Sequence, residues 1–209
     1  MSVTKELLII RHAEVEAKWK GICYGSLDVK LSESGKAACN AVAGDVLRHI
    51  YPATIFHSGL SRTRYLAESI ARLCGEDVHV LEDARIQERN YGDWQGLTWD
   101  AAYASDPEHF HHLIEKPNSY RPPGGESTSE MQHRVVEWLN EQPEHRYPII
   151  AISHSGPIAA VAGHCLGLHP REWSPWIVKH LERIRLAERN TEKYWEVTKT
   201  PLSIRAEPT

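Results

Sequence analysis

The sequence predicts an α/β protein, a three-layer α/β/α sandwich around a mostly parallel central sheet with an antiparallel edge strand. Between residues 5 and 81, short apolar runs that have no helical period alternate with stretches of helical period. A further apolar run at residues 148–152 leads into a helix of small residues. Two short alternating segments, at residues 183–186 and 194–197, predict the antiparallel edge.

Three strands and two helices are expected in the first part of the chain. The strands are predicted at residues 5–10, 53–56 and 78–81, and the second helix at 61–74, closed by Gly75. Ser32 has the side chain of a helix N-cap and opens the first helix. The apolar face of that helix is expected to contain Ala38, Ala41, Val42, Val46 and Leu47.

The middle of the chain is less regular. Residues 98–115 form a weak helical pattern interrupted by Pro107, and residues 117–125 read as a loop. Ser127 and Glu130 have the spacing of a capping box, which opens a helix through about Leu139. The strand at 148–152 is followed by a predicted helix at 157–168. With no repeat or linker, residues 1–209 are predicted to form one domain, with about 97–127 as an insertion.

Composition excludes several classes of protein. The 209 residues include 24 Lys and Arg against 28 Asp and Glu, a net charge of −4, which predicts no nucleic-acid partner. Polar residues and a proline interrupt the apolar stretch 148–168, so no membrane association is expected. The first ten residues do not resemble a signal peptide, and the four cysteines show no close pairing. A cytoplasmic protein with free thiols is predicted.

Polar side chains with reactive groups follow four predicted strands. In an open α/β sheet, ligands bind outside the carboxyl ends of the strands, so these residues are expected to meet. Arg11 and His12 follow the first strand, Arg62 the second and Glu88 the third, while His154 and Ser155 follow the strand at 148–152.

This set of side chains matches the chemistry of a phosphoryl group. Guanidinium forks fit its charged oxygens better than ammonium groups do. A neutral imidazole can attack phosphorus, and the P–N bond that forms is labile. A carboxylic acid nearby can protonate the leaving alkoxide, and backbone N–H groups at a helix N-terminus can bind the remaining oxygens.

Six motifs, in order, strengthen this interpretation. They span most of the chain, from about Leu7 to Leu168, and their combined order and spacing are specific. The motifs are Leu8-Ile9-Ile10-Arg11-His12-Ala13-Glu14, Gly25-x-x-Asp28-Val29-x-Leu31-Ser32-x-x-Gly35, Ser58-x-Leu60-x-Arg62, Glu88-x-x-Tyr91-Gly92-x-Trp94-x-Gly96, Pro123-Gly124-Gly125-Glu126-Ser127 and Ser153-His154-Ser155-Gly156.

The motifs resemble those of the histidine phosphatase superfamily, which has the phosphoglycerate-mutase-like fold. The resemblance implies that His12 is the nucleophile that becomes phosphorylated and that Glu88 is the general acid and then the base. It implies that Arg11, Arg62 and His154 hold the phosphoryl oxygens. It also implies hydrolysis without a metal ion or organic cofactor, and an insertion that covers the substrate.

Two positions depart from the family pattern. Ala13 replaces the usual glycine after the catalytic histidine, which is tolerable if its φ is negative because the backbone carbonyl is retained. Lys18 stands where asparagine is common. We expect Lys18 to contact the phosphate as a point charge, and Ser155 to contact it from the start of the following helix.

The expected partner is a small-molecule phosphomonoester, and formation of a homodimer is left open. Residues 21–25 with Asp28 and Val29 look most like the α-ribazole phosphatase and broad-specificity phosphatase branch, which makes α-ribazole 5′-phosphate a candidate substrate. A cofactor-dependent phosphoglycerate mutase is an alternative. In mutases a lysine and an arginine pair hold the substrate carboxylate, but Trp99 occupies the lysine position and residues 107–112 contain no arginine.

Several alternative interpretations apply to the same sequence. A protein that binds a phosphate ligand with little turnover is the alternative of another class. The sequence around Ser153 and Ser155 does not meet the G-x-S-x-G pattern of a serine hydrolase. The histidine cluster at residues 109–112 is interpreted as a solvated surface group in preference to a metal site. Four tryptophans could line a leaving-group pocket or fill a core: Trp94, Trp99, Trp173 and Trp176.

Overall fold

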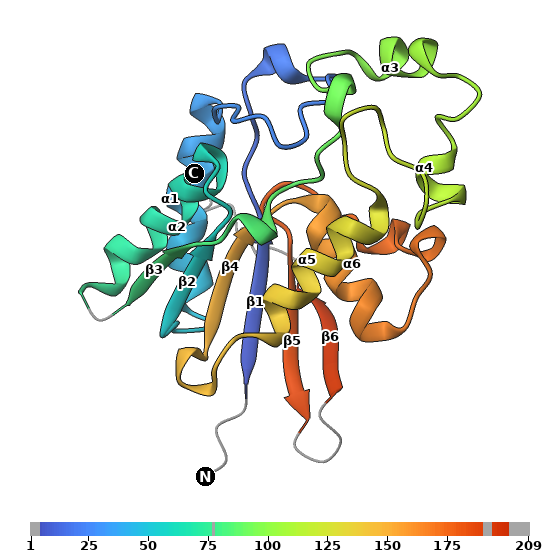
Figure 1. The fold of residues 1–209 in the computed structure, drawn as a ribbon. Helices are drawn as coiled ribbons and strands as arrows, with labels where there is room; N and C mark the ends of the chain where they lie inside the picture. Colours follow the sequence, from blue (N-terminus) through green and yellow to red (C-terminus); the bar gives the residue numbers. More distant parts are fainter. Residues whose placement is uncertain (1–4, 77, 190–193, 201–209) are drawn as a thin grey trace.

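Six strands form one sheet in the order β3-β2-β4-β1-β5-β6 in the computed structural model, which describes residues 5–76, 78–189 and 194–200 (Figure 1). The first four in this order are parallel, and β5 and β6 are antiparallel, so the predicted mixed sheet is confirmed. The strands are β1 Glu6–Arg11, β2 Thr54–His57, β3 His79–Glu82, β4 Ile149–Ser153, β5 Arg183–Arg189 and β6 Tyr194–Thr200.

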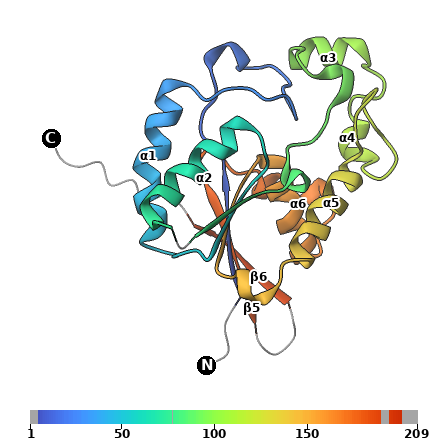
Figure 2. The same cartoon turned by 60° about the vertical axis from the view of Figure 1, so that its left-hand side comes forward.

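Helices cover both faces of the sheet (Figure 2). On one face lie α1 (Glu33–Leu47) and α2 (Ser61–Cys74), and on the other α5 (Thr128–Asn140) and α6 (Ser155–Leu166). Because side chains alternate along a strand, β1 contributes to both cores. Leu8 and Ile10 pack in the α1–α2 layer, and Leu7 and Ile9 pack in the α5–α6 layer.

The caps of these helices agree with the sequence, but the buried face of α1 is rotated from the predicted one. Ser32 caps α1 by accepting a hydrogen bond from the Gly35 amide at 2.9 Å, and Ser127 and Glu130 form the capping box of α5. Ala41 is exposed and Ala43 is buried. The stripe that faces the sheet therefore runs through Cys39, Val42, Ala43 and Val46, which are related by the helical spacing of three and four residues.

Helix α6 begins two residues before the predicted start. Its first residue is Ser155, so Pro157 lies within the first turn, where the backbone N–H groups have no partner inside the helix. A proline there breaks no hydrogen bond. The early start brings the amino end of α6 directly to the carboxyl end of β4.

The predicted insertion, residues 97–127, contains two short helices, α3 (Trp99–Ser105) and α4 (His112–Glu115), as the interrupted pattern indicated. Both lie above the carboxyl ends of the parallel strands, to one side of the sheet (Figure 1). Trp94 is buried beneath the insertion and stacks on Phe110 with ring centroids 5.1 Å apart. This tryptophan therefore fills a small core of the insertion.

Short 3₁₀ turns connect the main elements. The turns are η1 Ala17–Trp19, η2 Ala84–Ile86, η3 Gly92–Trp94, η4 Glu144–Arg146, η5 Pro170–Glu172 and η6 Ser174–Trp176.

The four cysteines are free thiols. Within the described residues, no helix has the length and apolar character needed to cross a membrane.

Candidate active site

The topology brings the reactive side chains together. Strand β4 lies between β1 and β2, so the carboxyl ends of these three strands are neighbours. The residue after β1 is His12, the residue after β4 is His154, and Arg62 lies in the first turn of α2. The rings of His12 and His154 meet edge to face with centroids 5.1 Å apart.

His12 is held in an orientation suited to a nucleophile. Its backbone N–H donates to the Ser153 carbonyl at 3.0 Å, which fixes the chain. Its ring Nδ1 lies 2.7 Å from the Ala13 carbonyl, which can only accept, so Nδ1 carries the proton. The lone pair is then on Nε2. Ala13 has no positive φ, so alanine at this position retains the carbonyl that orients the ring.

His154 and Arg62 form a buried unit around His12. Arg62 Nε donates to His154 Nδ1 at 3.3 Å, and His154 Nε2 lies 2.9 Å from Ser58 Oγ. Both ring nitrogens of His154 are thus engaged within the protein. The two terminal nitrogens of Arg62 donate to the carbonyls of Leu27 and Gly25 at 2.6 and 2.7 Å. These three bonds use three of its five N–H groups and leave two for an anion.

Arg11 has an unfilled hydrogen-bond donor. Its Nη1 donates to the Val178 carbonyl at 2.8 Å, whereas its buried Nε has no partner among the described residues. A buried donor without a partner is costly, and an anion bound beside His12 would satisfy it. His180 adds a third imidazole that sequence reasoning missed; its ring centroid lies 5.3 Å from that of His12.

Burial and positive charge keep these imidazoles neutral. Burial, with Arg62 and then other cationic groups adding to it, holds the pKa of His12 and of His154 well below the ordinary value. Burial and then Arg11 lower the pKa of His180 to about 4. A neutral imidazole is the form that can attack phosphorus, so His12 is in its reactive form at neutral pH.

The free energy of unfolding is expected to fall as the pH drops below about 6.5. The unfolded chain protonates its histidines there, while His12 and His154 stay neutral in the folded chain. Between about pH 7 and about pH 5.5, each should cost about 1 kcal/mol. Urea denaturation at the two pH values measures this loss.

Two variants test which histidines cause this pH dependence. His154→Gln should remove only its own share, about 1 kcal/mol, because His12 and His180 keep their lowered pKa values. His133→Gln, which removes an exposed histidine of α5, is the control for a histidine-to-glutamine change outside the buried group. A free energy of unfolding that is constant across this range in the wild-type protein would contradict the assignment of neutral buried imidazoles.

Glu88 lies at the amino end of α6. Its Oε2 accepts hydrogen bonds from Ser155 Oγ at 3.2 Å and from the Gly156 amide at 3.4 Å. Its Oε1 accepts from the Arg89 amide at 3.0 Å. The carboxyl group is half-buried and lies beside the helix that begins after His154. It is therefore placed to exchange a proton with a substrate atom near that helix end.

The backbone of the Glu88 segment is fixed by Arg134 of α5, a residue that sequence reasoning missed. Arg134 donates to the carbonyls of Arg85, Gln87 and Glu88 at 2.6, 2.9 and 3.2 Å. Its fork also pairs with both carboxylate oxygens of Glu126, at 3.0 and 2.7 Å. Glu126 belongs to one of the six motifs, but nothing local in the sequence marks Arg134 as its partner.

Glycine allows this segment to approach the motif loop closely. Gly92 has a φ of +55°, and a Cβ built on it would lie 1.9 Å from the Pro123 carbonyl oxygen. The Asp93 amide donates to that carbonyl at 2.8 Å, and the Asn90 amide donates to Glu126 at 2.8 Å. The two motifs that contain Glu88 and Glu126 therefore form one interlocked loop pair.

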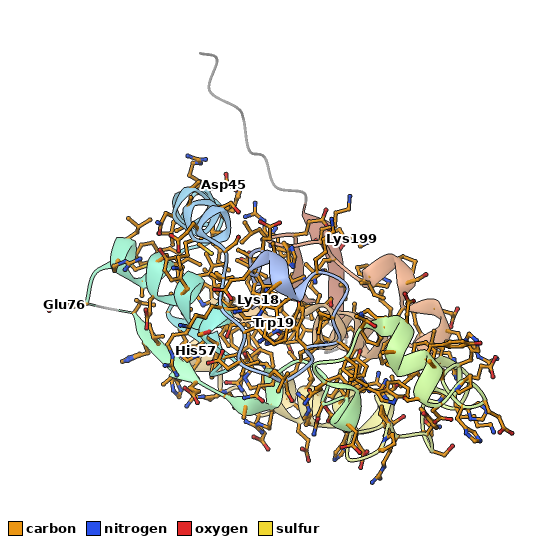
Figure 3. All side chains as sticks on the ribbon, turned by 90° about the horizontal axis from the view of Figure 1, so that it is seen from above. Lys18, Trp19, Asp45, His57, Glu76 and Lys199 are labelled. Carbon is orange, nitrogen blue, oxygen red and sulfur yellow. The ribbon has the colours of Figure 1, made fainter. Side chains whose placement is uncertain are left out.

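Lys18 and Ser155, the other predicted phosphate contacts, lie outside the buried unit of His12, Arg62 and His154. The ammonium of Lys18 pairs with Glu16 at 2.7 Å, and the Lys18 side chain is 68% exposed. Figure 3 shows Lys18 next to Trp19 on η1. Ser155 contacts Glu88, so its hydroxyl orients the carboxyl group. Direct contact of Lys18 or Ser155 with a phosphate stays a prediction.

The histidine cluster of the insertion has surface contacts of its own. His109 Nδ1 lies 2.9 Å from an Asp106 carboxylate oxygen, and the rings of His109 and His112 have centroids 5.1 Å apart. Across the part of the chain that the structure describes, no group of three or more His, Cys, Asp or Glu side chains could hold a metal ion.

The chain belongs to the histidine phosphatase superfamily (branch 1), whose model matches residues 7–199. The resemblance seen in the motifs is thereby confirmed. Phosphoserine phosphatase 1 of Hydrogenobacter thermophilus is 31% identical over 165 residues, which cover 78% of this chain and 77% of that protein. A 2,3-bisphosphoglycerate-dependent phosphoglycerate mutase of Cytophaga hutchinsonii is 28% identical, covering 95% of this chain and 97% of that one.

A solved structure with the same fold belongs to a mycobacterial glucosyl-3-phosphoglycerate phosphatase. It superposes with a TM-score of 0.76 at 28% identity and covers 94% of this chain and 98% of that one. Relatives of this chain therefore include phosphatases and a mutase that act on different small phosphorylated compounds.

Proposed function

We propose that this protein is a phosphomonoester hydrolase that works through a phosphohistidine on His12. The observation that carries the proposal is the orientation of His12: Nδ1 is bonded to the Ala13 carbonyl, and Nε2 carries the lone pair in a setting with two arginines. The superfamily model matches residues 7–199, a range that includes this group of residues.

The proposed reaction has two steps. In the first, His12 Nε2 attacks phosphorus, the P–O bond to the alcohol breaks, and Glu88 gives its proton to the leaving oxygen. Arg11 and Arg62 stabilise the charge on the phosphoryl oxygens. In the second, Glu88 removes a proton from a water molecule that attacks the phosphorus of phospho-His12. The P–N bond then breaks, which releases inorganic phosphate and regenerates free His12.

Hydrolysis is proposed in preference to the mutase reaction because of the surroundings of Trp99. Its ring packs edge-on against Tyr91 with centroids 5.4 Å apart, so an aromatic contact occupies the position where mutases have a lysine. A bisphosphoglycerate carboxylate would lack that cation. α-Ribazole 5′-phosphate remains a candidate substrate from the sequence motif, with residues 97–127 as a cover over the leaving group.

Turnover should survive chelation of metal ions. Arg11 and Arg62 supply the positive charge that a Mg²⁺ ion supplies in many phosphoryl-transfer sites, so p-nitrophenyl phosphate should be hydrolysed at an unchanged rate in EDTA. Vanadate, which adopts the five-coordinate geometry of phosphorus in the transition state, should inhibit this hydrolysis. Loss of activity in EDTA with recovery in zinc would contradict this and point to the histidines of the insertion. Phosphate binding without any turnover would instead favour the binding-protein alternative.

A further inference from the structure

A cavity near the candidate site is bounded by Glu88. It has a volume of about 310 Å³ and reaches Ser155 and Gly156 at the amino end of α6. A second cavity, of about 540 Å³, is lined by residues of η1, by Trp99 and by His180, and Glu88 is not among its lining residues. Since Glu88 is proposed to protonate the leaving oxygen, the cavity at Glu88 is the one that would receive the alcohol.

The walls of this cavity are mainly apolar, with side chains of Leu113, Met131, Ala159 and Trp173. The indole N–H of Trp173 donates to the Leu168 carbonyl at 3.3 Å, so the polar atom of this ring is used within the fold. Trp173 packs so closely against α6 that a Cβ on Gly163 would lie 2.1 Å from its Nε1. This wall is therefore rigidly placed.

Two buried polar side chains that line the cavity are already engaged, whereas Arg171, which is exposed, donates one hydrogen bond, to the Glu115 carbonyl at 3.3 Å. The guanidinium of Arg89 donates twice to the Glu126 carbonyl, at 3.0 and 2.9 Å, and once to Thr128 Oγ1 at 2.8 Å. The Thr128 hydroxyl itself donates to the Leu113 carbonyl. A carboxylate on a ligand would have to compete with these oxygens for Arg89.

Two isoleucines from different segments of the cavity lining are largely exposed. Ile114 of α4 is 59% exposed, and Ile177, which follows η6, is 58% exposed; both line the cavity. Figure 1 shows α4 close to the turns that follow α6, and the two segments bound this cavity together. Exposed branched side chains that converge on one cavity gain free energy when an apolar ligand covers them.

We infer that the enzyme takes phosphate esters of apolar alcohols, whose hydrocarbon part lies between Ile114 and Ile177 with the ester oxygen at Glu88. This inference rests on the proposed function and specifies the substrate class for the same site. Charged leaving groups such as serine or glycerate would gain nothing from the apolar walls, and an ion pair with Arg171, which is exposed to solvent, would offset little of their lost hydration.

The series ethyl, butyl and hexyl phosphate tests the inference, because the three alcohols are similarly poor leaving groups and differ in apolar length. The ratio kcat/KM should rise by about fourfold per added methylene until the cavity is filled. Hexyl phosphate should exceed O-phosphoserine and 3-phosphoglycerate. Ile114→Asn and Ile177→Asn should each lower kcat/KM for hexyl phosphate by about tenfold, and for ethyl phosphate by less.

Leu73→Asn is the matched control, because Leu73 is 58% exposed on α2, away from the residues that line the cavity. It should leave the whole series unchanged. A flat series, or a preference for phosphoserine, with p-nitrophenyl phosphate still hydrolysed, would overturn the inference and leave the proposed function standing. Failure to hydrolyse every ester, p-nitrophenyl phosphate included, would overturn the proposed function and the inference with it.

Discussion

Replacement of His12 is expected to abolish the covalent phosphoenzyme and to reduce turnover by on the order of 10⁴–10⁶. Nε2 is the ring nitrogen whose lone pair is free to attack phosphorus, because Nδ1 is hydrogen-bonded to the Ala13 carbonyl. Rapid quench with a ³²P-labelled ester should trap an adduct in the wild-type protein that is labile in acid and stable in base. His12→Asn, whose amide can still donate to that carbonyl, should form none.

His57 provides the control for this experiment. It is also buried and is the last residue of β2, and its Nδ1 accepts a hydrogen bond from the Gly59 amide at 3.0 Å. His57→Asn should still form the adduct. Circular dichroism of both variants separates loss of chemistry from loss of fold. An adduct that persists in folded His12→Asn would assign the nucleophile to another residue.

Replacement of Glu88 by glutamine is expected to affect esters according to their leaving groups. An alkoxide needs a proton in the transition state, so phosphorylation by an alkyl phosphate should slow by about 10²–10⁴. A p-nitrophenolate leaves without that help, so this first step should change little. Because Glu88 is also proposed to activate the water in the second step, p-nitrophenyl phosphate should show a burst of product followed by slow turnover.

Glu82→Gln is the corresponding control. Glu82 is at the end of β3 and pairs with Arg64 at 2.9 Å, outside the group around His12. It should leave the rates for both esters unchanged. Equal slowing of both esters without a burst in Glu88→Gln would contradict the assignment. His154 would then be the next candidate, although both of its ring nitrogens are bonded within the protein.

The fold was predictable wherever the signal was local. The apolar run of β1 and the capping box of α5 each depend on a few adjacent residues, and both elements formed as expected. The strand order was not predictable, because pairing of β1 with β4 joins segments far apart in the chain. Strand β5 continues to Arg189, beyond the predicted end, because its pairing with β6 sustains it without an apolar pattern.

The candidate site was predictable to the extent that it follows strand ends. His12, Arg62 and His154 lie together because parallel strands end at one edge of the sheet. His180 comes just before the antiparallel β5, where the rule for parallel strands does not apply. Arg134 acts on Glu88 through backbone carbonyls, and contacts of this type carry no sequence signature.

The place of β1 in the sheet has a consequence for biosynthesis. Both strands that flank β1 come from the last third of the chain, β4 at Ile149–Ser153 and β5 at Arg183–Arg189. Pairing between such distant segments forms only after most of the polypeptide has left the ribosome. The strand that ends next to His12 thus remains unpaired during most of translation. Stalled or truncated chains would contain His12, the proposed nucleophile, yet lack the residues that surround it in the folded protein, so the proposed catalytic site forms last.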